Sequence, residues 1–224
     1  MAKKRLTRKE MKEDKLAGLA QRVLKYVTAH PRRIRGVVAG IVAFAAIVLA
    51  LWAYVSSVQQ KALDNLSEAE DIYKEAKGDE EYHKAKEAFQ TVLEHYPWSK
   101  AARLALFYKG DCQYKLKEYQ EAENTFKVFV DKYSRHPLTP FVLLNLAGIY
   151  EARNDYGVAI KVYETILSKY PQHGVAPLAQ LAKGGCLEQL KKLALAEESY
   201  QRVLSLYPTS EWAEEAKERL EVIK

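Results

Sequence analysis

The chain has 224 residues, 48% of them apolar, and a formal net charge of +6. Residues 1–35 carry +9, with twelve Lys and Arg against three acids, whereas residues 56–224 carry −3. The excess positive charge belongs to the N-terminal arm alone, which argues against a chain that binds nucleic acid as a whole.

The basic arm, residues 1–35, is the first predicted element. Thr7 and Glu10 have the spacing of a capping box, which marks the start of a helix. The apolar residues that follow recur at helical spacing as far as the break at Pro31, and they are Leu16, Leu19, Val23, Leu24 and Val27. A basic amphipathic helix beside an apolar segment is expected to lie on anionic lipid. A docking helix for a cytosolic or ribosomal partner is one alternative, and nucleic-acid binding is another.

Residues 36–55 contain no charged side chain. As a helix they would span about 30 Å, the thickness of the hydrocarbon core of a bilayer. The run predicts a transmembrane helix that is retained as a signal anchor. A buried core helix would be shorter and less uniformly apolar, and a cleavable signal peptide would end in a small-residue cleavage site. Trp52 and Tyr54 instead fit an aromatic belt at the membrane surface.

The charges on the two sides of this run predict its orientation. Arg32, Arg33 and Arg35 precede it directly, and Lys61 is the first basic residue after it. The positive-inside bias therefore predicts a cytoplasmic arm and a translocated domain, residues 56–224. For a bacterial source this means a single-pass inner-membrane protein with a periplasmic domain.

A thirteen-residue pattern occurs four times in the translocated part, and each copy begins 37 residues after the previous one. In every copy an Ala is followed four residues later by an aromatic residue, seven and eight later by apolar residues, and eleven later by Tyr. These steps return to one face of an α-helix. Because a helix with one apolar stripe cannot bury it alone, the copies are expected to stack as an α-solenoid. The copies are residues 85–97, 122–134, 159–171 and 196–208.

A second helical segment precedes each copy, so that each unit is predicted to be a helix–turn–helix. The predicted fold is all-α, a single transmembrane helix followed by about four such repeats and a C-terminal capping helix. The leading helix of the first repeat is expected either to continue the membrane helix directly or to bend at Ser56 and Ser57. The repeats are predicted at about residues 60–97, 98–134, 135–171 and 172–208, and the cap at 209–224.

Over about residues 60–208 the chain resembles the tetratricopeptide repeat family, whose unit is usually 34 residues long. The family's first-helix glycine matches Gly110 and Gly184, whereas Ala147 stands at that position in the third unit. Its closing proline is replaced by Ser134 in the second unit, and each unit has three extra residues. The remaining matches are the closing prolines Pro97, Pro171 and Pro208, the second-helix alanines Ala85, Ala122, Ala159 and Ala196, and the aromatic residues Phe89, Phe126, Tyr163 and Tyr200.

The resemblance implies a concave groove lined by the leading helices. Its Lys, Arg and Asn clamp for a peptide carboxylate is absent, so a hydrophobic or aromatic-bearing partner is expected. Some of these positions could instead belong to the core, and the last helix could fold over the groove rather than cap the stack. The implied groove residues are Leu104, Phe107, Asp111, Tyr114, Phe141, Leu144, Gly148, Glu151, Leu178, Leu181, Gly185 and Glu188.

No catalytic motif is found, and neither a cofactor site nor a metal site is expected. The five histidines are scattered, and adjacent acids such as Glu80 and Glu81 are interpreted as solvated faces. Cys112 and Cys186 occupy equivalent positions two repeats apart, farther than the roughly 7 Å that a disulfide allows between Cα atoms. They are predicted to be buried, unpaired thiols.

In its layout the chain resembles the bacterial ancillary Sec-translocon subunit family. That resemblance implies a chaperone-like role for exported proteins, with translocon subunits and unfolded exported segments as partners. The 35-residue basic arm is longer than this family suggests. A cell-envelope scaffold for outer-membrane assembly or division complexes is the alternative. Anionic-lipid or nucleic-acid binding through the arm is an alternative of another class.

Overall fold

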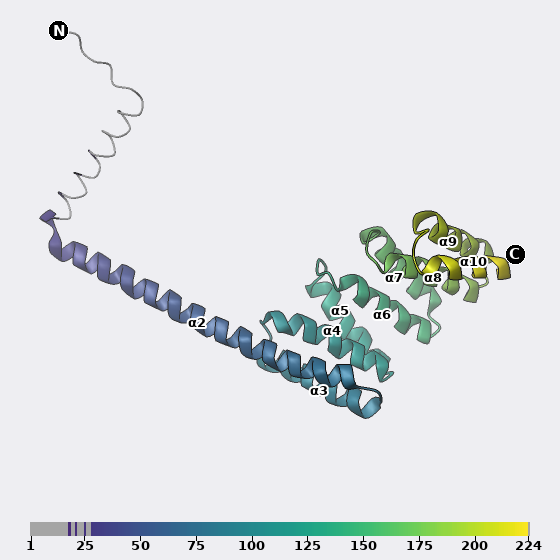
Figure 1. Cartoon of the computed structure of the whole chain (residues 1–224), viewed down its shortest axis with the longest axis horizontal. Helices are drawn as coiled ribbons and strands as arrows, with labels where there is room; N and C mark the ends of the chain where they lie inside the picture. The colour runs from purple at the N-terminus through teal and green to yellow at the C-terminus, as the bar shows by residue number, and fades with distance from the viewer. Residues whose placement is uncertain (1–17, 19–20, 22–24, 26–27, 224) are drawn as a thin grey trace, which may run out of the picture. The chain divides into compact units, whose positions relative to one another are not determined.

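The computed structural model describes residues 18, 21, 25 and 28–223. The predicted capping box and the apolar stripe of the arm lie outside these residues. Within the described part every regular element is an α-helix (Figure 1), which confirms the predicted fold class. The chain divides into two units, residues 1–57 and 58–224.

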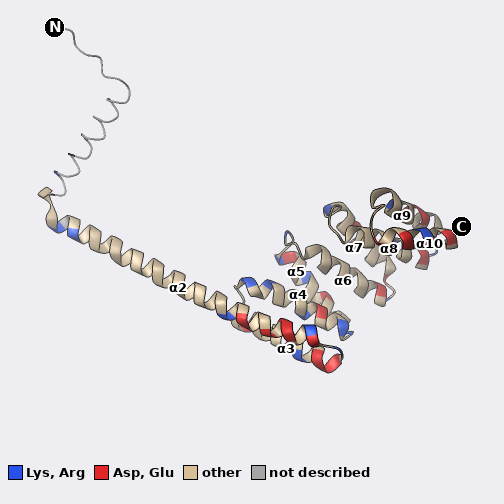
Figure 2. Cartoon of the chain, in the orientation of Figure 1, with Lys and Arg blue, Asp and Glu red and all other residues tan. Residues whose placement is uncertain are grey.

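Helix α2, Pro31–Glu75, contains the whole uncharged run. Every residue from 36 to 55 is exposed, and in Figure 2 this part of the helix has neither the blue of Lys and Arg nor the red of Asp and Glu. An 18-residue window within Ile34–Glu75 has a mean hydropathy of 2.5, which fits a membrane-crossing helix or a signal sequence. Exposed to water, so much apolar surface is unfavourable, whereas lipid would solvate it. Of the two alternatives at Ser56 and Ser57, the structure shows the continuous helix.

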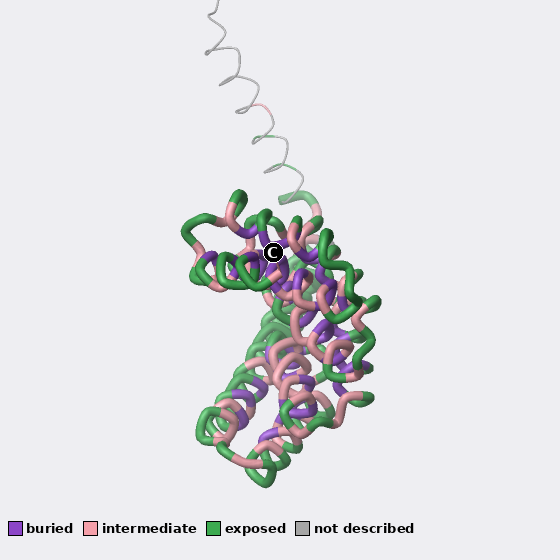
Figure 3. Tube along the Cα trace, turned by 90° about the vertical axis from the view of Figure 1, so that its right-hand side faces the viewer, coloured by how far each residue is buried: buried purple, intermediate pink, exposed green. Residues whose placement is uncertain are grey.

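The second unit consists of helix pairs that pack in chain order. The end of α2 packs with α3 and α4 through a core that includes Ala62, Leu66 and Phe89. We call α2, α4, α6 and α8 the leading helices and α3, α5, α7 and α9 the trailing helices. Figure 3 shows the buried residues of this unit where neighbouring helices face one another. The bounds are α3 Asp79–His95, α4 Lys100–Lys115, α5 Tyr119–Lys132, α6 Thr139–Ala152, α7 Tyr156–Lys169, α8 Ala176–Gln189, α9 Leu193–Leu206 and α10 Trp212–Ile223.

The repeated apolar stripe forms the core. The four alanines that open the pattern are fully buried, and the four aromatic residues after them are at most 2% exposed. The next stripe position is equally buried in every repeat. Burying one such aliphatic or aromatic side chain contributes about 1.5–3 kcal/mol. The residues at this next position are Val92, Phe129, Ile166 and Val203.

The tyrosine that stands eleven residues after the opening alanine joins neighbouring repeats in the last two copies of the pattern. The hydroxyl of Tyr170 donates a hydrogen bond of 2.7 Å to the backbone carbonyl of Ser134. The hydroxyl of Tyr207 makes the same contact, at 3.2 Å, with the carbonyl of Pro171. These two tyrosines therefore bridge to the turn one repeat earlier.

Helix α10 caps the stack. It packs mainly on α9 and also on α8. Ala213, Ala216 and Leu220 are buried, and Trp212 packs against the cluster that contains Tyr200. The predicted cap is therefore confirmed. Helix α10 takes the position after α9 that the leading helix of a further repeat would take. It therefore covers the apolar end of the fourth repeat.

Glycine is needed where an aromatic ring of a trailing helix approaches a leading helix. A Cβ added at Gly110 would lie 2.5 Å from Cε1 of Phe126, and one added at Gly184 would lie 2.3 Å from Cε1 of Tyr200. Both distances are shorter than van der Waals contact, and both rings are buried. The third repeat has Ala147 at this position, with Tyr163 still only 2% exposed.

We expect Gly110→Ala and Gly184→Ala each to destabilise the repeats by about 1–3 kcal/mol, because a buried ring must shift. Gly157→Ala is the matched control, since its added Cβ meets no atom within 4 Å. That substitution should stabilise by about 0.5–1 kcal/mol, as alanine favours helix. Urea unfolding of the detergent-solubilised chain, followed by circular dichroism, measures all three. Equal effects at the three glycines would contradict the assigned packing.

Candidate protein-interaction surface

The predicted groove residues lie on α4, α6 and α8, and their apolar members differ in exposure. Phe141 is 42% exposed and contacts the ring of His173, with centroids 5.0 Å apart. Leu181 is 6% exposed and packs with the core cluster of the last repeat. It also lines a hollow of about 220 Å³ between α8 and α10. The remaining apolar members, all half-buried, are Leu104, Phe107, Leu144 and Leu178.

Asp111 joins three successive leading helices. One carboxylate oxygen accepts a hydrogen bond of 2.5 Å from the hydroxyl of Tyr73 on α2. The other accepts one of 3.1 Å from the side-chain amide of Asn145 on α6. Burial, and then the Asp111 carboxylate, raise the pKa of Tyr73, so the phenol stays protonated as a donor. Asp111 is therefore occupied by internal contacts.

Glu151 and Glu188, one and two units later, are also occupied by contacts within the domain. Glu151 accepts hydrogen bonds of 2.9 Å from the hydroxyl of Tyr163 and from the thiol of Cys186. Glu188 accepts one of 2.8 Å from Tyr200, and its other oxygen lies 3.6 Å from the guanidinium of Arg219. The acids of the predicted groove thus hold helices together.

Tyr114, the remaining predicted residue, is half-buried, and its hydroxyl lies over Gly148 on the next leading helix. A Cβ at Gly148 would come within 3.0 Å of that hydroxyl oxygen. Gly185 occupies the equivalent position on α8, and a Cβ there would meet no atom closer than 4.0 Å. Among the predicted groove residues, Phe141 is therefore the most exposed.

A family model described as a tetratricopeptide repeat-like domain matches residues 34–223, which is almost the whole described chain. The chain belongs to the tetratricopeptide repeat-like domain family. The match begins within the N-terminal part of α2 and ends with α10. No match was found among curated proteins.

Solved structures of tetratricopeptide repeat proteins share the fold. A tetratricopeptide repeat protein from Parabacteroides merdae is 20% identical with a TM-score of 0.60, and the match covers 73% of this chain and 60% of that one. MamA from Desulfovibrio magneticus RS-1, residues 41 to the end, is 15% identical with a TM-score of 0.55, and the match covers 73% and 93% of the two chains. A double mutant of MamA RS-1 gives the same identity and TM-score, with 94% of its chain covered. At these identities the likeness shows the fold alone.

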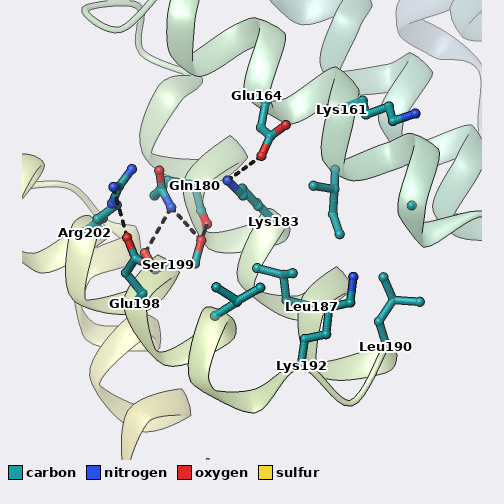
Figure 4. A pocket seen from close by; sticks show the side chains of 13 residues that line it. Lys161, Glu164, Gln180, Lys183, Leu187, Leu190, Lys192, Glu198, Ser199 and Arg202 are labelled. Atoms are coloured by element: carbon teal, nitrogen blue, oxygen red, sulfur yellow. Dashed lines mark hydrogen bonds and ion pairs between the residues drawn. The ribbon is translucent and has the colours of Figure 1, made fainter.

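The tetratricopeptide repeat-like domain has a second hollow that the sequence analysis missed. It encloses about 360 Å³ between α7, α8 and α9, and Figure 4 shows the side chains around it. Its base contains Gln180 and Ser199, which hydrogen-bond to each other. Two of its charged side chains, Lys183 and Glu164, are paired at 2.8 Å. Its apolar lining consists of Ile160, Leu187, Leu190 and Leu195.

An equivalent hollow, two repeats earlier, has a charged lining instead. There Lys86 forms an ion pair with Glu118 at 2.6 Å. The residues 74 positions later are Ile160 and Lys192, so the second hollow lacks this pair. No ion pair of Lys161 or Lys192 is found in the described part of the chain. The replacement of Lys86 and Glu118 by Ile160 and Lys192 at equivalent positions is the sequence signal that could have revealed this difference.

Both cysteines are buried and unpaired, as predicted. Burial raises the pKa of the Cys112 thiol to about 12. The pKa of the Cys186 thiol is raised by burial and then by its hydrogen bond to Glu151. Both groups are therefore thiols, with little thiolate, at neutral pH.

We expect Tyr73→Phe to destabilise the domain by about 1–3 kcal/mol, because Asp111 loses a donor while it remains half-buried. Tyr108→Phe is the matched control, since Tyr108 belongs to the same aromatic cluster. Its hydroxyl has no hydrogen-bond partner in the part of the chain described. Chemical unfolding of the full chain should leave the control almost unchanged. Equal losses would show that Asp111 does not use the Tyr73 hydroxyl.

We expect neither thiol to react with an aromatic disulfide reagent in the native chain at pH 8, because the raised pKa values leave almost no thiolate. Two thiols per chain should react after unfolding in guanidinium. A disulfide between Cys112 and Cys186, detected by mass spectrometry, would contradict the repeat register.

Proposed function

We propose that the chain is a membrane-anchored scaffold that binds apolar segments of other proteins along α4, α6 and α8. The exposed Phe141 on the leading helices, beside acids that are occupied internally, is the observation on which this proposal depends. An apolar surface of this kind recognises side chains released from water rather than a peptide carboxylate. The half-buried Leu104, Phe107, Leu144 and Leu178 would extend the contact.

The proposed arrangement places residues 36–55 in a bacterial inner membrane, with the basic arm in the cytoplasm and the repeats in the periplasm. The uncharged, fully exposed run in α2 and the arginines before it support this topology. In such a place the repeats would meet segments that leave the Sec translocon before they fold. A tethered surface raises the local concentration of binding sites, so that weak binding would suffice.

A photo-crosslinking amino acid at position 141, in the full chain in native membranes, tests this function. Position 158 is the matched control, because Val158 on trailing helix α7 is 41% exposed and Phe141 is 42% exposed. We expect crosslinks from position 141 to translocon subunits and to newly exported chains, identified by mass spectrometry, and few from position 158.

The possible results separate the proposals. Crosslinks from position 141 to outer-membrane assembly or division proteins would replace the translocon role by that of an envelope scaffold. Identical products from both positions would show that the leading-helix surface is not the binding site. Crosslinks only to cytoplasmic proteins would overturn the proposed orientation.

A further inference from the structure

Trp98 has a large hydrophobic side chain that the fold leaves exposed to water. It is 95% exposed, more than any other large hydrophobic residue in the part of the chain described. It lies in the turn between α3 and α4, just before Ser99 caps α4. The residues one, two and three periods later are polar, namely Arg135, Gln172 and Thr209. The indole is therefore specific to the first of the four turns.

This turn is tied to the start of the repeat domain. The backbone N–H of Lys100 donates a hydrogen bond of 3.0 Å to the side-chain oxygen of Gln59. Gln59 is four positions after Val55, the last residue of the uncharged run. In a helix four residues rise about 6 Å. That distance is comparable to the headgroup layer, which is roughly 5–8 Å thick on each side of the hydrocarbon core.

The chemistry of the turn suits the surface of a bilayer. Trp is enriched at membrane–water interfaces, where its ring is partly apolar and its N–H reaches water or headgroups. Lys100 and Lys61 are exposed, and basic residues near a membrane are attracted to anionic lipids. We propose that Trp98 inserts into the lipid headgroup layer where residues 36–55 leave the membrane. The turn between α3 and α4 is then a second membrane contact, and it rests on the proposed anchor.

The three tryptophans allow a direct test in the full chain. Each of Trp52, Trp98 and Trp212 is kept in turn, with the other two replaced by Phe, and each variant is reconstituted in phosphatidylcholine–phosphatidylglycerol vesicles. Quenching of fluorescence is measured with lipids that carry a nitroxide near the headgroup or deep in the acyl chain. Trp212 on α10, at the far end of the stack from α2, reports non-specific quenching.

We expect the shallow nitroxide to quench Trp98 at least twofold more than the deep one, and to quench it more than Trp212. Trp52, inside the run, should be quenched by both lipids. Quenching of Trp52 without quenching of Trp98 would overturn the inference but keep the anchor. Absence of quenching at Trp52 would overturn the anchor and the inference with it. Equal quenching of Trp98 and Trp212 would also overturn the inference, because no specific contact of the turn would remain.

Discussion

The repeat stack depends on the close approach of one trailing-helix aromatic ring to a leading helix in each unit. Gly110 and Gly184 leave space for the rings of Phe126 and Tyr200, which are buried almost completely. This contact sets the separation of the two helices in a pair. Protein interiors are close-packed, so a missing or added methyl group disturbs the packing. In the second, third and fourth units the small residue and the ring lie sixteen positions apart in the chain, so each of these units specifies its own pairing, whereas the first unit has Tyr73 at this place. The alanine that opens each pattern then allows the next pair to pack on it.

The local part of this design could be predicted from the sequence. The periodic stripe, the helix pairs, the cap and the uncharged run depend on residues that are close in the chain, and the structure shows all of them. The internal use of Asp111 could not be predicted, because its partners Tyr73 and Asn145 lie 38 and 34 positions away. A family position that usually faces a ligand here joins three successive leading helices. The burial of Leu181 likewise depends on α10, whose place became clear only in three dimensions.

Helix α2 combines two environments in one element. Its first part has the composition of a lipid-facing helix, while residues such as Ala62 and Ala69 are fully buried among protein side chains. Charged residues return only where the helix enters the repeat domain (Figure 2). The uncharged run and these buried residues both belong to helix α2, Pro31–Glu75. The predicted groove residues begin on α4, whereas the end of α2 packs into the core of the repeats.

The hydrogen bonds from tyrosines to the turn of the preceding repeat do not depend on which side chains the turn carries. Tyr170 and Tyr207 bond to backbone carbonyls, which every amino acid possesses. Substitutions in these turns should therefore have little effect on the stability of the repeat stack, provided that the backbone conformation is kept. The two bridged turns have Arg135 and Gln172 at equivalent places. The side chains of a turn, and therefore its contacts with other molecules, can change while the hydrogen bonds between repeats are kept.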